Sequence, residues 1–169
     1  MIHLYIGDGK GKTTAAMGLC LRMAGRDKPV LIAQFMKGSG SGERTVLAHI
    51  PQVTLLEVPE QVPFSFALTQ EEFVQEQCRY RRMLSEISET LGQNRTALLI
   101  LDEVCDAINA GLVDLQDVLH ILQTTSCEIV LTGRNPAPQL LQQAHYITNF
   151  QKERHPFDQG SPARLGVEF

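Results

Sequence analysis

The amino-acid sequence predicts an α/β fold in a single domain, residues 1–169, with a mostly parallel central sheet of about six strands flanked by helices. Short apolar runs of strand length alternate with helix-forming segments, and no linker long enough to divide the chain interrupts them. The first run, residues 2–6, leads through a glycine-rich turn into a helical segment, residues 15–24. A later run, residues 97–101, ends in two carboxylates. In a parallel sheet, such strand ends form the binding crevice.

Composition and charge narrow the class of ligand. With 169 residues, 43% hydrophobic and 20% charged, the chain is expected to be an ordinary globular protein with a proper core. The net charge of −4 argues against a nucleic-acid partner. Residues 1–44 nevertheless hold seven Lys/Arg against three Asp/Glu, whereas the remainder holds eight against sixteen. A positive region around the glycine-rich turn favours a small polyanion.

The cysteines and histidines indicate neither a zinc site nor a disulfide framework. The four cysteines lie far apart without a C-x-x-C pair, so reduced thiols and a cytoplasmic protein are expected. The five histidines show no spacing typical of metal ligands. No signal peptide or membrane span is expected, because the apolar runs are too short.

The most specific motif is the glycine-rich turn, which reads Gly7-Asp8-Gly9-Lys10-Gly11-Lys12-Thr13-Thr14. Strand, glycine-rich turn, lysine, hydroxyls and helix is the context of a phosphate-binding loop, or P-loop. The glycines let N–H groups turn inward around an anion, and the helix N-terminus adds partial positive charge. Lys12 would reach the phosphates and Thr13 would offer its hydroxyl to Mg²⁺. The alternative is a strand–helix turn without a ligand, which leaves the lysines and threonines without a role.

The carboxylates Asp102 and Glu103 directly follow the buried run at residues 97–101. In P-loop proteins, an acid at the end of a neighbouring strand holds the metal ion or one of its waters. Acids are also favoured at a helix N-terminus, so the pair alone leaves both interpretations open. Beside the P-loop motif, the metal interpretation is favoured: Thr13 and Glu103 would hold the ion, and Asp102 is the less favoured partner.

The other elements follow from periodicity and from helix caps. Strands are expected at residues 29–36, 53–58, 128–132 and 146–150. A capping box of Thr69 and Glu72 opens a long amphipathic helix that ends at Gly92, and shorter helices are expected around Gly111 and Asp114 and at residues 138–144. Residues 37–43 form a flexible loop that faces the ligand, and residues 152–169 are loop-like.

With these motifs in place, the chain resembles the P-loop type of corrinoid adenosyltransferase, the family that makes adenosylcobalamin and its precursors. The resemblance runs from residue 7 to the end of the chain. Three residues separate Gly7 and Gly11, one fewer than in the common P-loop pattern, and this shortened loop is a mark of the family. The matching segments are residues 7–16, Gln34-Phe35-Met36-Lys37-Gly38 with Gly42-Glu43, Leu101-Asp102-Glu103, Leu131-Thr132-Gly133-Arg134 and His155-Pro156-Phe157-Asp158.

The resemblance implies that a cobalt(I) corrinoid, cob(I)alamin or cob(I)yrinic acid a,c-diamide, attacks the 5′ carbon of ATP, with inorganic triphosphate as leaving group. It implies ATP and the corrinoid as co-substrates and Mg²⁺ or Mn²⁺ as the metal. A homodimer and a reducing partner protein are further expectations. No general base is needed, because cobalt is the nucleophile. The expected catalytic residues, which would stabilise charge on the triphosphate, are Lys10, Lys12 and Glu103.

The same resemblance assigns the remaining site residues. Thr14 would add a hydroxyl contact, and Gln34, Lys37 and Glu43 would line the crevice. Arg134 either contacts phosphate or pairs with a carboxylate. Phe64 and Phe66 stand where relatives tend to have an aromatic-x-Trp pair under the corrin, and this chain has no tryptophan. The two phenylalanines would form an apolar floor that excludes a lower axial ligand from cobalt, with ordinary core packing as the alternative.

Two other functions are compatible with parts of the pattern. A conventional P-loop ATPase or kinase would cleave between phosphates, and the shortened loop argues against it. A non-catalytic nucleotide- or corrinoid-binding relative would fit the missing tryptophan, but intact Lys12, Thr13 and Glu103 weigh against it.

Overall fold

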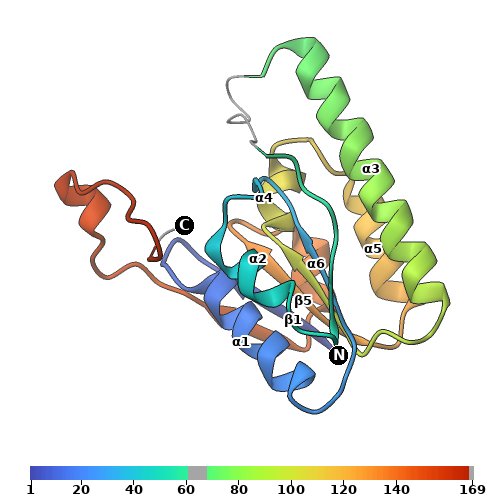
Figure 1. Ribbon diagram of the computed structural model, residues 1–169. Helices are drawn as coiled ribbons and strands as arrows, with labels where there is room; N and C mark the ends of the chain where they lie inside the picture. Colours follow the sequence, from blue (N-terminus) through green and yellow to red (C-terminus); the bar gives the residue numbers. More distant parts are fainter. Residues whose placement is uncertain (61–67, 168–169) are drawn as a thin grey trace.

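In the computed structural model, which describes residues 1–60 and 68–167, six strands form one sheet between two layers of helices (Figure 1). The order across the sheet is β3-β2-β4-β5-β1-β6, and all neighbouring strands are parallel. The predicted α/β fold with a six-stranded sheet is therefore confirmed. The strands are β1 (Ile2–Ile6), β2 (Val30–Gln34), β3 (Val53–Leu55), β4 (Leu98–Asp102), β5 (Glu128–Gly133) and β6 (Tyr146–Asn149).

Two adjacent strands of the binding edge, β2 and β4, are buried along their whole length. They are unbroken apolar runs up to their last residue because helices cover both faces of the sheet. Their register places Gln34 opposite Asp102, so two polar side chains end adjacent strands at the same edge. In the same way, β1 and β5 pair Ile6 with Gly133. The loops that follow these four strands consequently start side by side.

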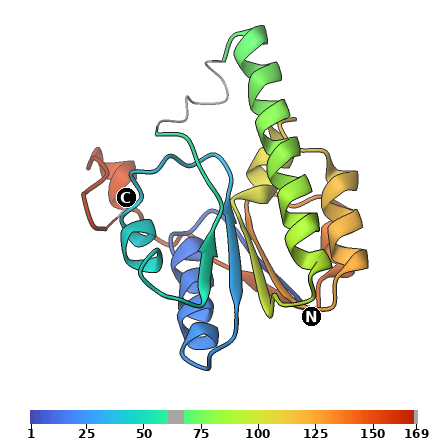
Figure 2. The same ribbon diagram turned by 45° about the vertical axis from the view of Figure 1, so that its right-hand side comes forward.

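The helices divide between the two faces of the sheet, as Figure 2 shows. On one face, α1 (Lys12–Ala24) and α2 (Gly42–Leu47) pack through small and apolar side chains such as Ala16, Cys20 and Leu47. The other face carries the larger core, formed by α3 (Gln70–Gly92), α4 (Val104–Asn109), α5 (Leu115–Thr124) and α6 (Pro138–Gln143).

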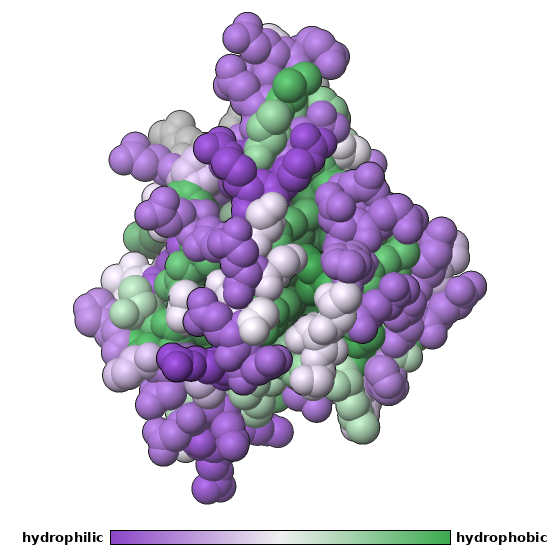
Figure 3. Space-filling view, turned by 90° about the vertical axis from the view of Figure 1, so that its right-hand side faces the viewer, coloured by the Kyte–Doolittle hydropathy of each residue, from purple (hydrophilic) through white to green (hydrophobic). Residues whose placement is uncertain are grey.

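Helix α3 begins with the capping box predicted from the sequence, and its buried side holds the start of the loop that follows β2. The Thr69 hydroxyl accepts from the backbone N–H of Glu72, and the Glu72 carboxylate accepts from the Thr69 N–H. On the buried side of α3, the Tyr80 hydroxyl accepts a 2.8 Å hydrogen bond from the N–H of Met36, just after β2. Its outer side is charged, and hydrophilic side chains predominate over this face of the molecule (Figure 3).

Several elements differ from the prediction, and two of them, β2 and β3, end earlier than expected, at Gln34 and Leu55. Helix α1 begins at Lys12, three residues earlier than expected, because the end of the P-loop already has helical backbone. Helix α2, a six-residue helix that was not predicted, begins at Gly42, inside the loop expected at residues 37–43. Within the tail, a short 3₁₀ helix, Pro156–Gln159, interrupts the predicted loop. Among the described residues, no helix is long and apolar enough to cross a membrane.

Candidate active site at the carboxyl edge of the sheet

A cleft of about 760 Å³ opens at the carboxyl ends of the strands, beside the N-terminus of α1. It gathers the P-loop, the loop after β2, the end of β4 and the turn after β5, as expected for an open parallel sheet. Met36, Asp106 and His155 also line it. The predicted site residues that line the cleft are Asp8, Gly9, Lys10, Gly11, Lys12, Thr13, Thr14, Lys37, Glu43, Glu103 and Arg134.

The P-loop is fitted against the chain that follows β6. Gly7 has a φ of 109°, and a β-carbon there would collide with Asn149 and Phe150. The N–H of Gly9 donates to the carbonyl of Phe150 at 2.7 Å. The N–H of Lys152 donates to a carboxylate oxygen of Asp8 at 3.1 Å. Glycine is therefore required at position 7 both for its backbone conformation and for the close approach of the neighbouring chain.

Lys12 folds back over its own loop. Its ammonium donates to the carbonyl oxygens of Gly7 at 2.7 Å and of Gly9 at 2.9 Å. Burial lowers the pKa of Lys12, and the nearby Arg134 guanidinium lowers it further. A second cation that disfavours the charge of Lys12 at the same cleft makes an anionic ligand there favourable.

Asp102 is fully buried and receives four hydrogen bonds. Its Oδ1 accepts from the hydroxyls of Thr13 at 2.9 Å and Thr132 at 2.7 Å. Its Oδ2 accepts from the Lys37 ammonium at 2.8 Å and from the Gln34 amide at 3.3 Å. The four hydrogen bonds offset the burial of this carboxylate, which holds together the segments that provide the donors.

Glu103 lines the cleft and has an uncommon backbone conformation. Its φ of 62° lies in the left-handed region, which a residue with a side chain adopts only when its surroundings impose it. Its N–H donates to the Thr132 hydroxyl at 2.8 Å. Burial raises the pKa of Glu103 to about 7; Lys37 opposes the shift, and the neighbouring Asp102 and Asp106 reinforce it. The nearby lysines thus do not fully offset the effects of burial and of the two neighbouring carboxylates on the negative charge of Glu103.

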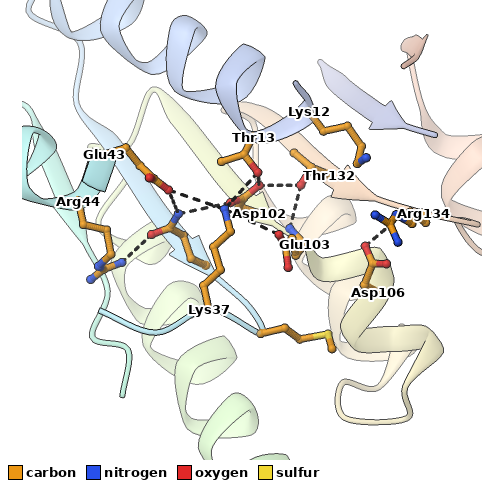
Figure 4. Close-up of polar contacts among 12 residues, drawn as sticks. Lys12, Thr13, Lys37, Glu43, Arg44, Asp102, Glu103, Asp106, Thr132 and Arg134 are labelled. Carbon is orange, nitrogen blue, oxygen red and sulfur yellow. Dashed lines mark hydrogen bonds and ion pairs between the residues drawn. The ribbon is translucent and has the colours of Figure 1, made fainter. Parts of the chain in front are cut away.

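Lys37 extends from the loop after β2 into a group of oxygen atoms (Figure 4). Besides the 2.8 Å ion pair with Asp102, its ammonium donates to the Thr13 hydroxyl at 3.1 Å. Carboxylate oxygens of Glu43 and Glu103 lie 3.7 and 3.8 Å away. Burial of Lys37 disfavours its charge, but Asp102 and Glu103 outweigh this effect and hold its pKa above the ordinary value.

Gln34 lies below the cleft, contrary to the prediction that it lines the crevice. It is only 1% exposed, and its amide nitrogen donates to Glu43 at 3.0 Å as well as to Asp102. The Arg44 guanidinium donates to the amide oxygen of Gln34 at 2.8 Å and to the carbonyl of Leu56 at 2.9 Å. Arg44 therefore turns the amide nitrogen of Gln34 towards the two carboxylates.

Arg134 follows β5 and lies at the cleft. The backbone N–H of Arg134 donates to Asp106 at 3.0 Å, and its side chain borders the cleft. This placement leaves its phosphate role a prediction. Phe64 and Phe66 lie outside the described residues. Sequence reasoning assigned no role to Thr132, Arg44 or Asp106, although Thr132 stands in one of the matching segments, two positions before Arg134.

The donor atoms around Thr13 fit a hard divalent cation that is also bound by phosphate. A threonine hydroxyl and the carboxylates of Asp102 and Glu103 are oxygen ligands of the kind Mg²⁺ prefers. Within residues 1–60 and 68–167, no three His, Cys, Asp or Glu side chains come together as a complete metal site. Mg²⁺ commonly takes one or two carboxylates and completes its shell with water and substrate phosphates, which suits this incomplete set.

Comparison with known proteins decides the family. The whole chain, residues 1–169, matches the family described as ATP:corrinoid adenosyltransferase BtuR/CobO/CobP. The chain belongs to this family. The resemblance carried by the P-loop and the later motifs is thereby confirmed, together with the expectation of an enzyme of the adenosyltransferase class.

Curated relatives named corrinoid adenosyltransferase align over the whole chain. A corrinoid adenosyltransferase of a Sinorhizobium species is 28% identical over 174 residues, covering 100% of this chain and 80% of the relative. The corrinoid adenosyltransferase of Escherichia coli K12 is 26% identical over 172 residues, covering 85% of that protein. Corrinoid adenosyltransferase CobA of Salmonella typhimurium is 27% identical and is likewise covered to 85%.

Proposed function

We propose that this adenosyltransferase binds the triphosphate of ATP in the cleft and presents the 5′ carbon to a cobalt(I) corrinoid. The observation that carries the proposal is the meeting of the P-loop with Thr13, Asp102 and Glu103 in one cleft. In the reaction, the electron pair of cobalt(I) forms the cobalt–carbon bond while the bond between C5′ and its oxygen breaks. The broken bond's electrons leave on the triphosphate.

The residues of the cleft suit this reaction because its negative charge grows on the leaving group. Lys12 exchanges its two loop carbonyls for phosphate oxygens, and Lys10 and Arg134 add positive charge at the same edge. The N–H groups of the loop and of the first turn of α1 bind the same anion. No general base is needed, since neither reacting atom has to lose a proton.

A magnesium ion belongs to the proposal as a further partner of the phosphates. Thr13 and Glu103 would hold it, and the fully hydrogen-bonded Asp102 would orient Thr13. When bound, the ion would neutralise charge on the leaving triphosphate. Asp102 thus acts mainly through its neighbours, whereas Glu103 reaches the ligand.

Phe64 and Phe66 are proposed to form the floor under the corrin. Truncation of either to Ala should reduce corrinoid turnover while ATP affinity and melting temperature stay nearly unchanged. If the two are core residues, each truncation would instead destabilise the fold by about 3–5 kcal/mol. A large loss of stability at both positions would end the floor proposal. A reducing partner protein and a homodimer are proposed from the family resemblance alone, and a cytoplasmic location is proposed from the widely separated cysteines.

The test of the proposed function is incubation with ATP, Mg²⁺ and a chemically reduced corrinoid under anaerobic conditions. The expected product has the absorbance of an alkyl–cobalt bond and loses it on illumination. Omission of ATP or of the protein serves as the control. Binding of ATP and corrinoid without this product would instead indicate a non-catalytic relative, and release of ADP would indicate a conventional ATPase or kinase.

A further inference from the structure

The position of Lys37 raises a question about how a divalent cation enters the site. Its ammonium lies within 3.1 Å of the Thr13 hydroxyl and 2.8 Å of Asp102, with Glu43 and Glu103 under 4 Å away. These include the oxygens to which the proposed function assigns the metal ion. An ammonium and a divalent cation cannot occupy the same position, so one must leave before the other binds.

The Lys37 ammonium compensates the negative charge of the carboxylates that surround it. Asp102 is fully buried, and a buried carboxylate without a nearby cation is costly. Glu43 and Glu103 add negative charge around the same point. Lys37 supplies one positive charge to this group, and its side chain is itself only 17% exposed. A divalent cation in its place would supply two.

The chain around Lys37 allows the ammonium to move away. Residues 37–41 belong to neither a helix nor a strand, and they include Gly38 and Gly40. The N–H of Met36 is fixed by Tyr80, so movement would begin at Lys37 itself. The four-carbon stem of a lysine can redirect its ammonium without a shift of the backbone. Lys37 also borders the cleft, where incoming phosphate would offer it new partners.

We propose that Lys37 is a tethered cation that occupies the divalent-ion position of the ligand-free protein and gives it up when ATP brings the ion. The inference rests on the proposed function for the identity of the ligands. Its consequence is that the protein without nucleotide resists divalent cations, although the oxygens that would bind them are in place. ATP favours the exchange by supplying both phosphate ligands for the ion and a new anionic partner for Lys37.

The inference is tested by Mn²⁺ binding to nucleotide-free protein, followed through the electron paramagnetic resonance signal of free Mn²⁺. Lys37→Gln removes the charge and keeps a hydrogen-bond donor for Asp102. This variant is expected to bind Mn²⁺ at least about tenfold more tightly than the wild type, because a positive charge that competes for the same oxygen atoms is lost. Equal affinity of Lys37→Gln and the wild type would overturn the inference.

Two further variants make the comparison specific. Lys28→Gln removes the same charge from an exposed residue just before β2, at the opposite edge of the sheet, and should bind Mn²⁺ as the wild type does. Glu103→Gln added to Lys37→Gln removes a carboxylate assigned to the ion and should abolish the gain; a gain that survives it would place the ion elsewhere and overturn the inference. Lys37→Met, which keeps the unbranched stem, is measured in parallel in case Lys37→Gln does not fold.

Failure of this inference is distinguishable from failure of the proposed function. Mn²⁺ binding without nucleotide requires neither ATP nor corrinoid. Unchanged Mn²⁺ affinity together with normal adenosyl transfer by the wild type would remove the role of Lys37 alone. Tighter Mn²⁺ binding in a protein that forms no alkyl–cobalt product would remove the proposed reaction and support the exchange of cations.

Discussion

The Thr13 hydroxyl donates a 2.9 Å hydrogen bond to Oδ1 of Asp102, and so joins the first turn of α1 to the end of β4. The two residues lie 89 positions apart in the chain. Because the Thr132 hydroxyl donates to the same oxygen, β5 is tied to this point as well. The P-loop is thereby held at a fixed place over the sheet edge before any ligand arrives, and this favours binding without a large rearrangement.

The first prediction concerns Lys12. Lys12→Ala should abolish turnover and weaken ATP binding by about 10- to 100-fold, because a charge-assisted partner of the triphosphate is lost. Titration calorimetry with ATP and the alkyl–cobalt assay measure the two effects. Lys28→Ala, which removes an exposed lysine remote from the cleft, is the matched control. Near-normal turnover in Lys12→Ala would remove the P-loop from the mechanism.

The second prediction separates the two neighbouring carboxylates. Asp102→Asn should destabilise the fold by about 3–5 kcal/mol, since it leaves the buried Lys37 without its closest counter-charge. Glu103→Gln should leave the fold intact and lower both activity and the dependence on Mg²⁺. Urea unfolding and Mg²⁺ titration of the reaction distinguish them. Unchanged Mg²⁺ dependence in Glu103→Gln, together with its loss in Asp102→Asn, would reverse the assignment.

The third prediction is a pH dependence of stability that arises from Glu103. Its pKa is raised from the ordinary 4.5 to about 7 in the folded protein, mainly by burial. The stabilisation from the protonated carboxyl is thus fully present below pH 4.5 and is lost as the pH rises through about 7. The stability of Glu103→Gln relative to the wild type should therefore be higher at pH 8 than at pH 5. Melting curves of ligand-free protein at both values test this, and an equal difference at both would contradict it.

The fourth prediction concerns Thr132, which the sequence did not single out as a ligand. Thr132→Val keeps the shape but removes a buried hydroxyl that binds both Asp102 and the N–H of Glu103. The loss of stability should be about 1–3 kcal/mol, and Glu103 should be held less firmly. Thr148→Val on the exposed strand β6 is the control and should change little. A Thr132→Val protein as stable as the wild type would show that the hydroxyl is not needed.

The sequence predicted the elements whose signals are local. The capping box of Thr69 and Glu72 and the glycine-rich turn after β1 need only a few consecutive residues. Short apolar runs that alternate with helical segments were sufficient to predict the parallel sheet. Helix α2 was missed because it has only six residues and follows a run of glycines, so it offers no stretch long enough to show a helical period.

The network around Asp102 was beyond sequence reasoning for a different reason. Lys37 and Asp102 are 65 positions apart, and Arg44 reaches Gln34 from a helix that was not expected. Such contacts depend on strand order and register, which place Gln34 opposite Asp102 only once the sheet is formed. The residue types of the site could thus be proposed from the motifs, whereas the pairing of Lys37 with Asp102 required the structure.

The central claim is that ATP is cleaved at its 5′ carbon, and phosphorus NMR of the reaction with reduced corrinoid tests it most directly. The account predicts one inorganic triphosphate for each light-sensitive alkyl–cobalt product formed. ADP with phosphate, or AMP with pyrophosphate, appearing in step with the consumption of ATP would contradict it, because cleavage would then lie between phosphates.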